Sequence, residues 1–183
     1  MPRPLRLLLL TSLTTVAFAS AATAGRKYVG VKTCRTCHKA AERGDQYSKW
    51  KKGPHAKAYA TLGTDKAKKL AAEAGVSGDP QKSDQCLKCH VTGYGKPPES
   101  FGRKYRVEDG VGCESCHGAG SDFKTKSIMR DRAKAKANGL IEPDEKLCRT
   151  CHNKESPTFK PFDFEERKKE ISHPLPPDKK KPK

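Results

Sequence analysis

The chain has 183 residues and a formal net charge of +17, and only 34% of its residues are hydrophobic. Its length suits a single domain. Its composition excludes a conventional hydrophobic core of the size that such a domain normally buries. Groups other than apolar side chains are therefore expected to fill much of the interior.

The first 24 residues have the pattern of a secretory signal peptide. Two arginines precede an apolar run at residues 7–19, and Ala22-Thr-Ala24 supplies a small-residue cleavage site. The run is too short to span a bilayer comfortably, so no integral membrane segment is expected. We predict an exported chain that begins after Ala24, with cleavage after Ala19 or Ala21 as the alternatives.

The remaining sequence predicts short helices joined by long loops. Helical periodicity or capping signals mark residues 39–42, 47–62, 65–74, 127–138, 143–152 and 164–171. Pro54 begins a new helical turn within the second of these segments, and Gly75 and Gly139 end the third and fourth. Outside the helices we expect an extended segment at 25–33, a flexible loop at 91–100, a short strand at 101–108 and a basic, disordered tail at 175–183.

All eight cysteines fall in four copies of one pentapeptide, Cys-x-x-Cys-His. This spacing is typical of covalent haem attachment, because each cysteine can form a thioether with one vinyl group while the histidine binds the iron as the proximal ligand. The cysteines are Cys34, Cys37, Cys86, Cys89, Cys113, Cys116, Cys148 and Cys151, and the histidines are His38, His90, His117 and His152. The sequence therefore predicts four covalently bound haem c groups.

Other uses of paired cysteines explain this pattern less well. A zinc ribbon has no use for a histidine after each pair, and a disulfide framework would place cysteines outside the motifs. Haem is attached outside the cytoplasmic membrane in bacteria, in agreement with the signal peptide. We predict a compact multihaem fold at residues 25–174, mainly α with long loops, in which four haems form most of the core.

The iron ligands can be counted from the sequence. Of the six histidines, four belong to the motifs, so His55 and His173 are the candidate distal ligands. Met129 is the only methionine left once the signal peptide is removed, and methionine is the next ligand to consider. At least one iron therefore lacks a strong protein ligand. Alternatives stay open, because His55 and His173 could be surface histidines and Met129 an ordinary packing residue.

At these residues the chain resembles the tetrahaem cytochrome c-554 family. The first motif is followed by Trp50 and by His55-Ala-Lys-Ala. The second is followed by Val-Thr-Gly-Tyr-Gly, and the third lies in the stretch Gly110-Val-Gly-Cys-Glu-Ser-Cys-His-Gly-Ala-Gly120. The resemblance implies a mostly helical fold with haems in stacked pairs. The family's founding member carries electrons away from hydroxylamine oxidoreductase in ammonia-oxidising bacteria.

The resemblance also implies a set of ligand pairs. His55 is implied as the distal partner of His117, and His173 as that of His152. The haem of His90 is implied to be five-coordinate. The family's remaining distal histidine is absent here, and Ser127-Ile-Met129 stands in its place. Met129 is thus the implied substitute on the haem of His38, a change that usually raises the reduction potential.

The expected function is periplasmic transfer of single electrons between redox protein partners. The alternative is reduction of a small molecule such as nitric oxide at the open haem. Against it, the sequence has no surplus histidine as a proton donor, and it does not place acids such as Asp84 or Glu114 at the haem. A subunit of a larger cytochrome assembly is a third possibility, and the oligomeric state is left open. Enzyme activity is therefore uncertain, and an electron carrier is favoured.

The charge of the chain points to the nature of its partners. After cleavage, 36 basic and 21 acidic residues give the polypeptide a charge of +15, which the haem propionates would reduce to roughly +7. An exported compartment argues against nucleic acid. We expect a redox partner with an acidic docking surface, steered by charge, with solubility alone as the alternative role of the lysines.

Overall fold

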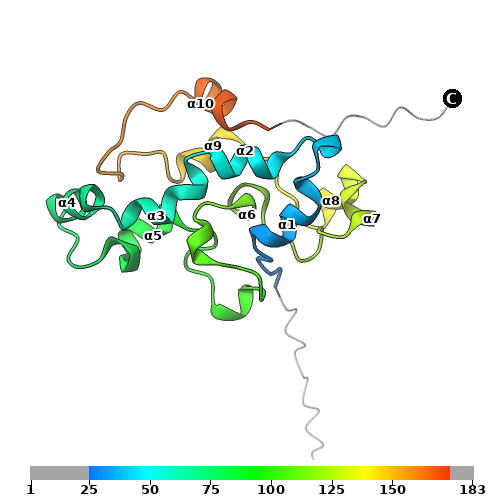
Figure 1. Ribbon diagram of the computed structural model, residues 1–183, viewed down its shortest axis with the longest axis horizontal. Coiled ribbons are helices and arrows are strands. Elements are labelled where there is room, and N and C mark those ends of the chain that lie inside the picture. The colour runs from blue at the N-terminus through cyan, green and yellow to red at the C-terminus, as the bar shows by residue number, and fades with distance from the viewer. Residues whose placement is uncertain (1–24, 174–183) are drawn as a thin grey trace, which may run out of the picture.

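The structure is a computed structural model, and it describes residues 25–173 (Figure 1). In this range the chain forms short α-helices and 3-10 turns joined by long loops, as predicted. The α-helices are α1 Val31–His38, α2 Gln46–Lys52, α3 Ala58–Leu62, α4 Asp65–Glu73, α5 Asp84–His90, α6 Cys113–His117, α7 Lys126–Met129, α8 Arg132–Ala137, α9 Glu145–Arg149 and α10 Phe164–Ile171. The 3-10 turns are η1 Ala41–Arg43, η2 His55–Lys57, η3 Pro80–Lys82, η4 Pro98–Ser100 and η5 Val107–Asp109.

The predicted signal peptide and basic tail, and residue 174 of the predicted domain, lie outside the described residues. Between residues 25 and 173, no helix has the length and apolar character needed to cross a membrane.

The helices are too short to be stable alone, so local caps and tertiary packing must hold them. Acidic side chains cap several N-termini by accepting a backbone N–H: Asp131 caps α8, Asp144 caps α9 and Asp163 caps α10. In Figure 1, α3, α4 and α5 gather at one end of the molecule and α7 and α8 at the other, with α1 and α6 between them. The motif-bearing helices α1, α5 and α6 are therefore spread along the molecule.

The polypeptide itself supplies a small core. The buried hydrophobic residues of the described range are Val29, Val31, Ala56, Leu62, Ala71, Phe123 and Ala135. Three of these are alanines, and each alanine buries little apolar area. This agrees with a composition too polar for a conventional core.

Several predicted helices are confirmed with close boundaries. The last helix, Phe164–Ile171, has the predicted bounds. The helix predicted at 65–74 is α4, and it is followed by Gly75 in the left-handed region, at φ +75°. Pro54 precedes η2, which places His55 at the start of a helical turn.

Other predicted elements are wrong. Residues 101–108 do not form a strand, because Phe101 makes only an isolated bridge to Tyr28 and η5 then follows. The helix predicted at 127–138 is two helices, since Asp131 leaves the helical conformation to cap α8 with its side chain. The helix predicted at 143–152 is limited to α9, so the fourth motif runs from its end into a turn. Only part of 25–33 is extended, because α1 begins at Val31.

Candidate metal centres

In three of the four motifs, the histidine ring is oriented by an oxygen atom next to its Nδ1. The distances are 3.1 Å from His38 to Gln46 Oε1, 2.7 Å from His90 to the Ala58 carbonyl, and 3.1 Å from His117 to the Ile141 carbonyl. A carbonyl oxygen can only accept, so Nδ1 must donate its proton and Nε2 is left with a free lone pair. This is the arrangement of a histidine that binds a metal through Nε2.

Gln46 is itself held in place by the chain. Its amide nitrogen donates to the Arg43 carbonyl, which turns Oε1 toward His38. Gln46 is buried at the start of α2, so the ring of His38 in α1 is oriented by the next α-helix.

The two histidines outside the motifs each face a motif histidine. The ring centroids of His55 and His152 are 6.0 Å apart, and those of His117 and His173 are 5.9 Å apart. Imidazole nitrogens bind ions such as zinc at about 2.0–2.1 Å, so two rings on opposite sides of one ion have centres roughly 6 Å apart. Both pairs have the separation of two imidazoles that share one metal ion.

The His55–His152 pair is also in the protonation state that metal binding requires. Burial lowers the pKa of His55, and the neighbouring His152 lowers it further. Burial likewise lowers the pKa of His152, with a contribution from Arg167. Both rings therefore stay neutral at pH 7, and a neutral imidazole is the form that binds a metal.

The observed pairs are the reverse of those that the family resemblance implied. His55 faces His152 rather than His117, and His173 faces His117 rather than His152. The Val111 N–H donates to the backbone carbonyl of His55 at 3.1 Å, so the backbone of His55 lies beside the third motif while its ring is turned to the fourth.

The two pairs use both spare histidines. Among the described residues, no histidine ring faces His38 or His90. Met129 is the last residue of α7 and is half-buried. Its assignment to the iron of His38 stays a prediction, as does an open iron at His90.

The motif cysteines of different helices lie close together. All eight are free thiols in the described chain. A hydrogen bond with Cys113 and burial raise the pKa of Cys34. Burial and the neighbouring Cys151 thiol raise the pKa of Cys89 to about 11. Burial and the neighbouring Cys148 thiol raise the pKa of Cys116 to about 11. The motifs thus lie in a row, in the order first, third, fourth, second.

Thr92 is a residue that the sequence analysis missed. Residues 91–100 were expected to be a flexible loop, yet Thr92 is only 5% exposed. Its hydroxyl accepts from the Gly112 N–H at 2.8 Å and lies 2.8 Å from the Ser115 hydroxyl. The Tyr105 hydroxyl donates to the Thr92 carbonyl at 2.7 Å. Thr92 therefore connects the second motif to the third, and no local pattern in the sequence indicates this.

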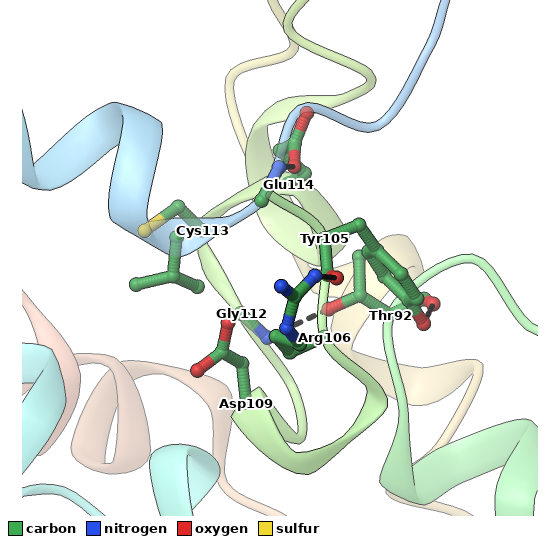
Figure 2. A pocket seen from close by; sticks show the side chains of 9 residues that line it. Thr92, Tyr105, Arg106, Asp109, Gly112, Cys113 and Glu114 are labelled. Carbon is green, nitrogen blue, oxygen red and sulfur yellow. Dashed lines mark hydrogen bonds between the residues drawn. The ribbon is translucent and has the colours of Figure 1, made fainter. Parts of the chain in front are cut away.

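Thr92 lines a small cavity beside the third motif (Figure 2). The cavity has a volume of about 10 Å³, which is close to the minimum for one water molecule. Tyr105, Asp109 and Glu114 also line it. Burial raises the pKa of Tyr105 to about 12, with Asp109 as the next contribution, so the phenol stays protonated and donates.

Comparisons with known proteins show which proteins the chain is similar to. The family model described as "Cytochrome c554 and c-prime" matches residues 33–118, which contain the first three motifs. Cytochrome c-554 of Nitrosomonas europaea is 34% identical over 167 residues, a match that covers 79% of this chain and 66% of that protein. The solved structure of reduced cytochrome c554 from that organism matches with a TM-score of 0.53 and 28% identity, covering 79% of this chain and 78% of that one.

Proposed function

The chain belongs to the cytochrome c554 family, and from this premise we propose that it is a periplasmic tetrahaem c-type cytochrome that transfers single electrons between redox proteins. The observation that carries the proposal is the two facing histidine pairs, at 6.0 and 5.9 Å. Two imidazoles on opposite sides of an iron leave no position for a substrate, so such a centre is suited to electron transfer.

The residues present fit haem c at each motif. The eight cysteines would attach the vinyl groups, and His38, His90, His117 and His152 would be the proximal ligands. We assign His55 as the distal ligand opposite His152, His173 as that opposite His117, and Met129 as that of the His38 centre. When bound, haem supplies the one-electron redox chemistry. The chain orients the imidazoles of His38, His90 and His117 through Nδ1.

The order of the motifs supports a route for electrons. Because neighbouring motifs bring their thiols together, the first, third, fourth and second motifs form a continuous row. An electron accepted at one end would reach the other through short steps between neighbouring centres. The positive polypeptide charge supports docking of acidic redox partners near this row.

Two measurements on the exported protein test the proposal. Intact mass spectrometry of the periplasmic fraction should show the chain from residue 25 with four haems and no free thiol. An electron paramagnetic resonance spectrum of the oxidised protein should show low-spin signals from two bis-histidine centres. Three or fewer haems in fully processed material, or retention in the cytoplasm, would overturn the proposal.

A second function is favoured by one observation at His90. Both spare histidines face other motifs, so within residues 25–173 no histidine ring lies opposite His90. An open iron there could reduce a small molecule such as nitric oxide. Carbon monoxide should then bind one of four reduced haems, and steady-state turnover of nitric oxide should exceed that of free haem. Binding without turnover would leave the protein an electron carrier, and no binding would remove the open site.

A further inference from the structure

A buried carboxylate lies inside the third motif and takes no part in the ligand scheme. Glu114 stands between the two cysteines of α6 and is only 5% exposed. Its oxygens accept from three backbone N–H groups, those of Val29 at 2.7 Å, Gly30 at 2.8 Å and Gly120 at 2.7 Å. Figure 2 shows the side chain reaching the segment that leads into α1.

These bonds join the first motif to the third. Val29 and Gly30 directly precede α1, and Gly120 follows α6, so one side chain holds both sides of the contact. Gly30 has φ +83°, and a Cβ there would lie 2.3 Å from the Lys104 carbonyl oxygen. Only glycine fits that position, so the N–H groups that meet Glu114 are presented by a fixed backbone.

The carboxylate also brings a negative charge into the interior. All three of its neighbours are donors, so it is bound as an acceptor-only carboxylate. In the described part of the chain, no lysine or arginine forms an ion pair with it. The carboxylate lies next to the first motif, because it accepts from Val29 and Gly30 immediately before α1.

The second and fourth motifs are joined differently. Lys88 of the second motif forms an ion pair with Glu155, which follows the fourth. The two side chains are 42% and 66% exposed, so water screens the pair and its charges cancel. A buried charge without an ion-pair partner therefore lies between the first and third motifs. The contact between the second and fourth motifs has no such charge.

We infer that Glu114 is a positioning residue that fixes the first-motif and third-motif haems against each other and lowers the reduction potentials of those two haems. The inference rests on the proposed function. A negative charge in a low-dielectric interior stabilises the ferric state, which carries one more positive charge than the ferrous state. The second-motif and fourth-motif haems are farther along the row and should be affected less.

Three variants test this in the haem-loaded protein. Glu114→Gln removes the charge, Glu114→Asp keeps it but shortens the side chain, and Glu155→Gln removes an exposed acid at the other pair. Paramagnetic NMR of the haem methyl groups during a redox titration reports each haem separately. Relative to the wild-type protein, Glu114→Gln should raise the potentials of the His38 and His117 haems more than those of the other two. Glu114→Asp should lower thermal stability yet keep the potentials near wild type, and Glu155→Gln should change neither.

Equal shifts at all four haems, or no shift with Glu114→Gln, would overturn the inference. If that variant does not fold, the haem potentials of the wild-type protein still test the inference. The His117 and His152 haems have the same bis-histidine ligands in our assignment, so the His117 haem should have the lower potential, and a higher one would refute the role of Glu114. Loss of haem from the wild-type protein would instead refute the proposed function, and mass spectrometry separates the two failures.

Discussion

His55 and His173 each lie opposite a motif histidine, and we propose that each is the distal ligand of the centre that it faces. The ring of His55 faces His152 although its backbone is hydrogen-bonded to Val111, beside the third motif. A side chain can therefore serve one motif while its backbone is held by another. The turn η2 therefore contacts both the third and the fourth motifs.

Replacing His55 by alanine tests this assignment. The His152 haem should become high-spin and bind carbon monoxide when reduced, because it loses its distal imidazole. The His117 haem should stay low-spin. The matched variant His173→Ala should give the opposite result, with the His117 haem affected. A high-spin His117 haem in His55→Ala would restore the pairing that the family resemblance implied.

Met129 is the second residue whose role can be decided by substitution. Met129→His should keep the His38 haem low-spin and lower its potential, because imidazole is the better donor to ferric iron. Met129→Leu should make the same haem high-spin. A redox titration and an electron paramagnetic resonance spectrum measure both changes. Unchanged spectra and potentials in Met129→Leu would show that Met129 only packs.

At the scale of secondary structure, the motif helices depend on contacts with other segments. The helix α6 has five residues and no side-chain cap, so it cannot be stable by itself. Thr92 and Glu114 compensate, since Thr92 accepts the Gly112 N–H just before the helix and Glu114 binds the segment before α1. The positions of the motifs are thus set by buried polar contacts between loops.

Thr92→Val measures how much one such contact contributes. Valine has a similar shape but leaves the buried Gly112 N–H without its acceptor, so we expect a loss of about 1–3 kcal/mol in the free energy of unfolding. Thr61→Val is the matched control, because its hydroxyl donates to the Lys57 carbonyl at an exposed site, and it should change stability by less than about 0.5 kcal/mol. Thermal unfolding followed by circular dichroism checks both. Equal losses of unfolding free energy in the two variants would show that the buried Thr92 contact contributes no more than an exposed one.

At the scale of the whole molecule, the small protein core and the excess of basic residues are the main features. The described chain buries few large apolar side chains, so bound haem should contribute much of the stability. The lysines and arginines are distributed over most of its helices, from α1 to α10. They give the molecule a positive field that would attract an acidic partner.

Association with such a partner should therefore depend on salt. We expect the rate of electron transfer to an acidic redox protein to fall as the ionic strength rises past about 0.1 M, where the Debye length is about 10 Å. Stopped-flow kinetics at several salt concentrations measure this. Transfer to a neutral small-molecule acceptor provides the control and should change little. If the rate with the acidic protein did not change with salt, the lysines would serve solubility alone.

The sequence by itself determined the chemistry of this protein. Thioether attachment and proximal ligation need residues that are neighbours in the chain, so four pentapeptides are enough to predict four haem sites. The helix over 164–171 was also predictable, because its cap and its periodicity are local. The strand predicted at 101–108 failed because weak alternation means little without a partner strand.

Only the tertiary structure decided how the sites are arranged. Which histidine faces which depends on contacts between residues about a hundred positions apart, as for His55 and His152, and spacing along the chain does not contain that information. The same holds for Glu114, whose donors Val29 and Gly30 lie 85 and 84 residues away in the chain, and for Thr92, which looked like part of a loop. Local chemistry is encoded in neighbouring residues, whereas the geometry between haem sites depends on long-range packing that forms when the chain folds.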